Sequence, residues 1–189
     1  MERLGKRGIP VTDEYVKAVT SMGFQEAAEY TVRRYGLAQT VEEIIDEWKR
    51  MCRKAYGHSV LLKPYAKETL LRLRRSGIKL GVATALSPDL FVPALERNGV
   101  HAWFDAFASL QEVQRGKGFP DIYLLAAQRL DAEPSRCMVF EDILAGILGA
   151  KSGGFQTCGV YDESSAHDWE KICAAADRTL VSFEADGAL

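Results

Sequence analysis

The stretch "VFEDILAGILGAKSGG", residues 139–154, decides the fold predicted for this chain. The apolar residues from Cys137 to Phe140 predict a strand, and it ends on the adjacent carboxylates Glu141 and Asp142. A helix of small residues follows and stops at a double glycine. Two ionised carboxylates at a strand end repel each other and lose solvation unless a cation or hydrogen-bond donors compensate. A helix N-terminus also favours acidic residues, but this alternative explains one carboxylate better than it explains both.

On both sides of this stretch, predicted strands alternate with predicted helices. The strands occupy residues 78–84, 103–109, 136–142, 155–161 and 179–182, and the helices occupy residues 67–75, 87–98, 119–131, 143–153 and 167–177. Such alternation, with strands that are apolar on both faces, predicts a parallel sheet that helices cover on each side. The predicted fold class is therefore α/β, with a Rossmann-like parallel sheet flanked by helices.

The first third of the chain is predicted to be helical instead. Thr12 is placed to cap a first helix, residues 25–35 form a second, and "TVEE" at 40–43 is a capping box for a third. We therefore expect two domains. A small α-helical domain covers residues 1–63, and the Rossmann-like core covers residues 64–189.

Composition excludes several classes of protein. The chain has 189 residues, 47% of them hydrophobic, with a net charge of −2 and a pI near 6.0. Nucleic acid and anionic membranes need a basic surface on their partners, so neither is expected. No apolar run approaches the roughly 18 residues of a membrane span. The four cysteines show no C-x-x-C spacing, which favours a reducing, cytoplasmic setting.

Chemistry in parallel sheets lies beyond the carboxyl ends of the strands, and this rule selects a small set of residues. Thr84 ends one strand, and its hydroxyl and the Ala85 amide suit a phosphate. Lys117 lies between glycines, in a loop that can bend back over the sheet. Alone, Thr84 is an ordinary strand-end residue and Lys117 an ordinary solvated lysine. With Glu141 and Asp142 they describe a site that binds phosphate and Mg²⁺.

Several stretches resemble the haloacid dehalogenase-like hydrolases. They are "GIKLGVAT", "FDAFAS", "GKGFPDIYLLAAQRL", "SRCMVFEDILAGILGAKSGG" and "CGV". The similarity is to the small sugar-phosphate and phosphoglycolate phosphatases that carry an α-helical cap, and it runs roughly from Pro64 to Tyr161. Residues 1–63 resemble that cap in pattern only. The resemblance implies a Mg²⁺-dependent phosphatase that acts on a small phosphorylated metabolite through an aspartyl-phosphate.

The resemblance also implies a role for each candidate residue. Thr84 and Ala85 would bind the transferring phosphate, Lys117 would stabilise the phosphate and the nucleophile, and Asp142 with Glu141 would hold Mg²⁺. The cap would select the substrate.

Two further positions of the cap fall where the family often places a specificity loop. These are Gly23 and Phe24, and we expect them to contact the substrate.

One part of the family's pattern is not found. Its nucleophile is an aspartate in a D-x-D-G-T stretch at the end of a central strand, and this sequence contains no D-x-D. We expect the N-terminal strand that carries the nucleophile, which in the family lies between the strands ending at Thr84 and Glu141, to be missing. The chain as given would then be inactive or nearly so. Two open strand edges would form a slot through which copies could self-associate.

Two functions of different classes remain open from the sequence. The first is the phosphatase, with its nucleophile upstream of Met1. The second is a catalytically inactive module that binds a phosphorylated ligand or a protein partner. A dinucleotide-binding domain receives little support, because "GILGAKSGG" does not fit G-x-G-x-x-G. The dehalogenase, mutase and phosphonatase branches of the family also stay open.

Overall fold

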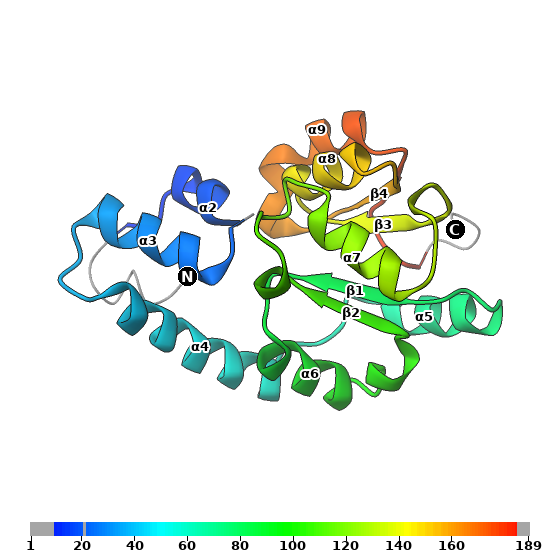
Figure 1. Ribbon diagram of the computed structural model, residues 1–189, viewed down its shortest axis with the longest axis horizontal. Coiled ribbons are helices and arrows are strands. Elements are labelled where there is room, and N and C mark those ends of the chain that lie inside the picture. The colour runs from blue at the N-terminus through cyan, green and yellow to red at the C-terminus, as the bar shows by residue number, and fades with distance from the viewer. Residues whose placement is uncertain (1–9, 21, 185–189) are drawn as a thin grey trace.

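The computed structural model of the chain describes residues 10–20 and 22–184 (Figure 1). Helices α2 (Asp13–Thr20), α3 (Phe24–Tyr35) and α4 (Val41–His58) form a helical part at one end of the molecule. The remaining elements form an α/β part. Among the described helices, none combines the length and the apolar character that crossing a bilayer requires.

Local sequence signals account for the helical part. Thr40 and Glu43 form the predicted capping box at the start of α4. Gly36 ends α3 in the left-handed conformation, at φ 58°, which glycine adopts without strain. The rings of Phe24 and Trp48 pack edge to face with centroids 6.1 Å apart, and they join α3 to α4.

The α/β part follows the predicted alternation. Its elements in chain order are α5 (Ala66–Arg75), β1 (Gly81–Thr84), α6 (Pro88–Arg97), β2 (Ala106–Ser109), α7 (Asp121–Arg129), β3 (Met138–Glu141), α8 (Leu144–Ser152), β4 (Gln156–Val160), the 3-10 helix η4 (Glu163–Asp168), α9 (Trp169–Ala175) and β5 (Arg178–Leu180). All strand pairs are parallel, which confirms the α/β fold class. The strands are shorter than predicted. Strand β1 begins only at Gly81. Just before it, Leu80 N donates to the Asp105 side chain at 2.8 Å, and the Leu80 carbonyl accepts from Asp105 N and Ala106 N.

The strands are divided between two sheets. One contains β1 and β2, and the other contains β3, β4 and β5 in that order. In register, Thr84 pairs with Ser109, and Glu141 pairs with Gly159. Within the described residues, β1 pairs only with β2, and β3 pairs only with β4. The facing sides of β1 and β3, here called the open edges, are therefore unpaired.

Burial along the strands agrees with this division. Every residue of β1 is at least partly exposed, as are the first three residues of β3, whereas the last four residues of β4 are buried. Phe140 on β3 is 36% exposed. Central strands of a parallel sheet are normally buried on both faces. Here β1 and β3, which border the break between the two sheets, are less buried than β2 and β4, with which they pair.

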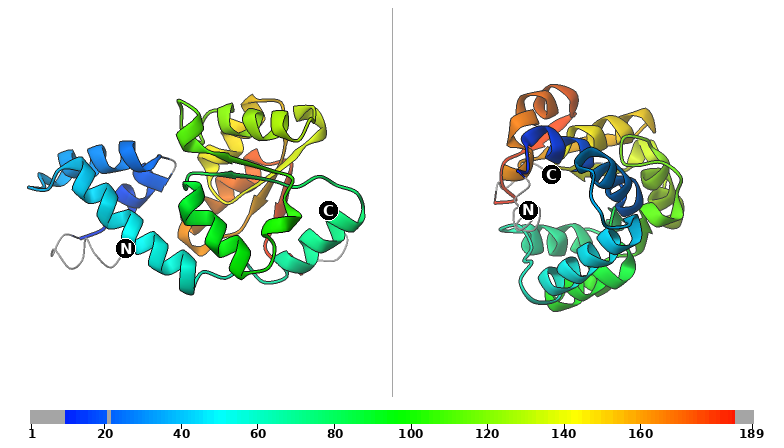
Figure 2. Two further views of the ribbon diagram at one scale, coloured as in Figure 1. Left: turned by 60° about the horizontal axis from the view of Figure 1, so that its bottom comes forward. Right: turned by 90° about the vertical axis from the view of Figure 1, so that its left-hand side faces the viewer.

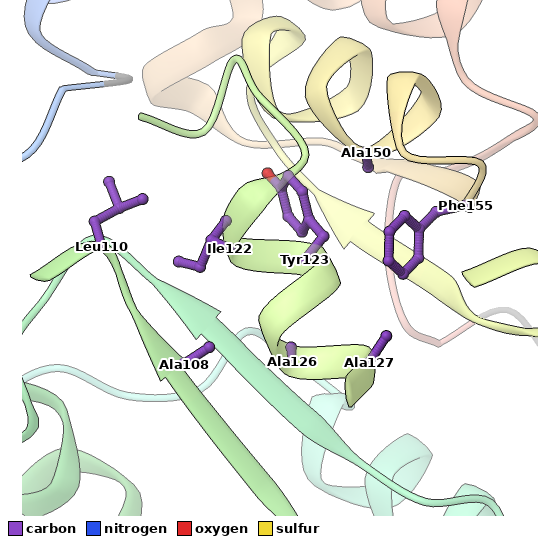
Figure 3. Packing of buried hydrophobic residues seen from close by; sticks show 8 residues of the cluster. All are labelled: Ala108, Leu110, Ile122, Tyr123, Ala126, Ala127, Ala150 and Phe155. Carbon is purple, nitrogen blue, oxygen red and sulfur yellow. The ribbon is translucent and has the colours of Figure 1, made fainter. Parts of the chain in front are cut away.

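Helix α7 joins the two sheets across the break. Its buried residues Ile122 and Tyr123 lie in one apolar cluster with Ala108 of β2, Ala150 of α8 and Phe155 before β4 (Figure 3). The rings of Tyr123 and Phe155 pack edge to face with centroids 6.2 Å apart. Figure 3 also shows β1 and β3 running in the same direction. Their carboxyl ends therefore lie at the same end of the α/β part.

The helical part is attached to the α/β part by ionic and packing contacts. Lys17 of α2 contacts Asp168 of η4 at 3.2 Å, and Arg53 of α4 contacts Asp89 of α6 at 2.7 Å. Helix α4 leads from the helical part to α6 and packs on it (Figure 2). The domain boundary expected after residue 63 falls in the linker between α4 and α5, and it stays a prediction.

Candidate functional site

Thr84 and Ala85 stand at the carboxyl end of β1, in the turn that leads into α6. The Thr84 hydroxyl accepts a hydrogen bond from Leu86 N at 3.1 Å. Helix α6 begins at Pro88, which has no N–H, and Leu90 N donates to the Ser87 carbonyl at 2.9 Å. The amide predicted to bind phosphate is that of Ala85, in the turn before the helix. Within the described residues, Thr84 makes no hydrogen bond with Lys117 or Asp142. The two parts of the predicted site therefore lie at the ends of the two open edges, with no hydrogen bond between Thr84 and either of these residues.

Lys117 and Glu141 form a salt bridge at the carboxyl end of β3. The lysine side chain is 16% exposed and the glutamate side chain 4%, so the pair is withdrawn from water. The Tyr123 hydroxyl donates to the same Glu141 oxygen, Oε1, at 2.9 Å. Burial and the Glu141 charge raise the pKa of Tyr123 far above its ordinary range. The phenol therefore stays protonated and acts as a donor.

The glycines of α8 make this arrangement possible. A Cβ at Gly149 would lie 2.1 Å from the backbone carbonyl oxygen of Lys117, and a Cβ at Gly146 would lie 2.7 Å from Cδ of Glu141. Neither position has room for a side chain. The loop of Lys117 thus rests directly on α8, which explains why the helix after "VFED" consists of small residues.

Asp142 lies one residue beyond β3 and is partly buried. In the part of the chain that the structure describes, its carboxylate makes no hydrogen bond or salt bridge. Burial and the neighbouring Glu141 raise its pKa, while the ammonium groups of Lys117 and Lys63 act in the opposite direction. The Asp142 carbonyl accepts a hydrogen bond from the buried Ser165 hydroxyl at 2.5 Å. Asp142 is thus held by its backbone, with a carboxylate that lacks a close partner.

The two carboxylates predicted to hold Mg²⁺ therefore differ in their bonding. Lys117 and Tyr123 occupy Oε1 of Glu141, whereas the Asp142 carboxylate is available. Within residues 10–20 and 22–184, no three His, Cys, Asp or Glu side chains gather in a metal-binding arrangement. Mg²⁺ commonly takes one or two carboxylates and completes its shell with water and phosphate oxygens. These residues fit one side of such a site, and Glu141 as a second ligand stays a prediction.

Among the described residues, no hydrogen bond or ring contact joins Gly23 or Phe24 to these residues. Gly23 precedes α3 as its N-cap, and Phe24 packs on Trp48 within the helical part. Their predicted role in specificity stays a prediction.

The structure adds three residues that the sequence did not indicate. Tyr123 donates to Glu141, Ser165 holds the Asp142 carbonyl, and Lys63 contacts the carboxyl end of β4. Tyr123 gave no signal in the sequence, because hydrophobicity favours its neighbour Leu124 as the buried residue. Neither Ser165 nor Lys63 had any spacing signal, because each contact depends on the path of a loop.

Comparison with known proteins identifies the family. Residues 2–154 match the family model described as haloacid dehalogenase-like hydrolase. The chain belongs to the haloacid dehalogenase-like hydrolase family. The resemblance noted in the sequence is thereby confirmed.

Curated relatives in this haloacid dehalogenase-like family include phosphatases. The chain is 29% identical to validoxylamine A 7'-phosphate phosphatase from Streptomyces hygroscopicus subsp. limoneus over 170 residues, which cover 90% of this chain and 78% of that protein. It is 25% identical to a phosphorylated carbohydrates phosphatase from Thermotoga maritima, covering 94% of this chain and 82% of the relative.

A solved structure of the family has the same fold over the whole chain. CbbY from Rhodobacter sphaeroides, a mutant in complex with xylulose-(1,5)bisphosphate, superposes with a TM-score of 0.82 at 28% identity. The match covers 100% of this chain and 87% of that one.

Proposed function

We propose that this chain carries the substrate-binding and metal-binding half of a Mg²⁺-dependent phosphatase for a small phosphorylated carbohydrate. The main support is the arrangement of Lys117, Glu141 and Asp142 at the carboxyl end of β3 in a family that includes carbohydrate-phosphate phosphatases. All four cysteines, which lie in the described part, are free thiols. Free thiols suit the cytoplasmic setting that we propose for it.

The phosphate would bind between the two halves of the site. The Thr84 hydroxyl and the Ala85 amide would supply hydrogen-bond donors on the side of β1. On the side of β3, Lys117 supplies a positive charge close to the same position. The lysine already neutralises the buried Glu141, so a bound phosphate would share its ammonium rather than receive a free one.

Mg²⁺ would be held by the Asp142 carboxylate, and Glu141 is the second carboxylate that the sequence predicts as a ligand. When bound, it would offset the negative charge of the phosphate oxygens and polarise the phosphorus for attack. Ser165 fixes the backbone of Asp142, so the carboxylate is positioned before any ligand arrives.

The attacking carboxylate is not identified among the described residues. The sequence contains no D-x-D, and we propose that a strand pairing with both open edges supplies the nucleophile. Such a strand would be parallel to β1 and β3 and would end beside Thr84 and Lys117. This position matches what in-line attack on a phosphate held there requires.

Hydrolysis of a generic aryl phosphate with Mg²⁺ tests this proposal. The chain is compared with a form extended upstream to an in-frame D-x-D, and each is compared with its Asp142→Asn variant. The exposed Asp46→Asn serves as the matched control. Activity in the extended form alone, lost in Asp142→Asn and retained in Asp46→Asn, supports the proposal. Activity that survives Asp142→Asn refutes the role of this carboxylate.

A second candidate function is an inactive module that binds a phosphorylated ligand or a partner through the open edges. The observation that favours it is the Lys117–Glu141 salt bridge, because the lysine already has a carboxylate partner and does not need one from a nucleophile. Self-association through the open edges would raise the native mass above the 21.0 kDa of one chain. A charge at the edge, Val82→Lys, should then restore the monomer. The control Val181→Lys, at a residue that is 71% exposed, should not.

A further inference from the structure

The linker between the helical part and the α/β part brings a second ammonium group to the site. Lys63 donates to the carbonyl oxygen of Tyr161 at 3.2 Å and forms a salt bridge with Asp162 at the carboxyl end of β4. Strand β4 pairs with β3, so this contact lies beside Asp142. The neighbouring linker residue Leu62 is held at a different place: its backbone N–H donates to the side chain of Asn98, which follows α6.

Asp162 is bound from two sides. One of its oxygens accepts hydrogen bonds from the Ser164 backbone and hydroxyl at 2.9 and 2.6 Å, and the other contacts Lys63. Burial alone would raise the pKa of Asp162, but these bonds from Lys63 and Ser164 hold it at about 2. Asp162 is therefore ionised at any physiological pH, and its charge acts on Asp142 together with that of Lys63.

Three carboxylates and two ammonium groups determine the charge at Asp142. The carboxylates are Glu141, Asp142 and Asp162, and the ammonium groups that pair with or act on them are Lys117 and Lys63. One negative charge is left uncompensated, on the carboxylate that lacks a partner. Without Lys63 the excess would be two negative charges. That environment would favour a divalent cation and disfavour a phosphate dianion.

We propose that Lys63 is a specificity-determining residue that sets the balance between phosphate and Mg²⁺ at the site. The inference rests on the proposed function, since it concerns the same site. Lys63 neutralises Asp162, so Asp142 remains the single carboxylate with uncompensated charge. A phosphate can then bind next to Mg²⁺ without repulsion from a second bare carboxylate.

Binding measured by calorimetry, rather than activity, tests this role. The probes are Mg²⁺ alone, and inorganic phosphate in the presence of Mg²⁺. We expect Lys63→Met to weaken phosphate binding roughly three- to tenfold and to strengthen Mg²⁺ binding by a smaller factor. Asp162→Asn should change both constants in the opposite directions, because it removes the carboxylate and releases the ammonium. Lys63→Arg should bind as the wild type does.

The matched control is Lys67→Met. Lys67, in α5 shortly after the linker, also donates to a backbone carbonyl, that of Asn98 at 3.0 Å, but no carboxylate is bonded to it in the described chain. If Lys63 had only a structural role, Lys63→Met would weaken the binding of both Mg²⁺ and phosphate, in the same direction as Lys67→Met.

The outcomes separate the two proposals. Unchanged constants in Lys63→Met, with binding lost in Asp142→Asn, would overturn the role of Lys63 and leave the site in place. Binding that is indifferent to Asp142→Asn, or absent in the wild type, would overturn the proposed function and this inference with it.

Discussion

The buried Lys117–Glu141 pair allows a quantitative prediction for Lys117→Met. Methionine keeps most of the side-chain volume but leaves the Glu141 carboxylate, 4% exposed, with only the Tyr123 hydroxyl as partner. Removing one member of a buried pair costs about 3–5 kcal/mol. Since domains are stable by only about 5–15 kcal/mol, we expect a large loss. With urea slopes of about 1–3 kcal/mol/M, the midpoint should fall by at least about 1 M.

Two further variants isolate the cause. Lys117→Met with Glu141→Gln should recover much of the loss, because the buried charge is gone. Lys151→Met removes a lysine whose pair with Asp177 is about 40% exposed on both sides. It should cost no more than about 1 kcal/mol.

A Lys117→Met variant as stable as the wild type at pH 7 would refute the argument, as would a double variant no more stable than Lys117→Met alone.

Other predictions follow from the packing and the surface charges. Gly149→Ala should destabilise the fold by about 3 kcal/mol in urea unfolding, because its methyl group would meet the Lys117 carbonyl. Gly57→Ala, in α4 with open space around it, should stabilise by about 0.5–1 kcal/mol, and a loss there would contradict the packing argument. Bonds from Lys151 and Thr157 lower the pKa of Asp177 to about 2. Asp177→Asn should therefore cost at most about 1 kcal/mol at pH 7, a figure reduced for exposure, and the cost should vanish between about pH 4 and pH 2.

The sequence predicted the architecture well, because the signals involved are local. The capping box at Thr40 and the alternation of strands and helices depend on residues within a few positions of one another. The grouping of Lys117, Glu141 and Asp142 also followed, since the carboxyl ends of parallel strands meet at one edge. The order of strands and helices was therefore enough to group these residues, without knowledge of their side-chain contacts.

Partners across the sheet could not be predicted in the same way. The resemblance implied that Lys117 would stabilise the phosphate and the nucleophile, whereas in the structure the lysine pairs with Glu141. Hydrophobicity favours Leu124 over Tyr123 as a core residue, yet Leu124 is 41% exposed and Tyr123 is 2% exposed. Small side chains at Ala126 and Ala127 allow α7 to approach the sheets on the side of Tyr123. Such contacts depend on the close approach of helices, which periodicity does not specify.

The open edges and the Lys117–Glu141 salt bridge together restrict the kind of strand that could pair with β1 and β3. Among the described residues, the backbone groups on the open edges of β1 and β3 pair with no other strand, whereas Lys117 and Glu141 already pair with each other. A strand that pairs there would therefore be held mainly by hydrogen bonds and apolar contacts. If that strand carried the attacking carboxylate, it would bring a further negative charge beside Asp142, which is already under-compensated. A divalent cation offsets that repulsion, so insertion of the strand and binding of Mg²⁺ should strengthen each other, by the same factor in both directions.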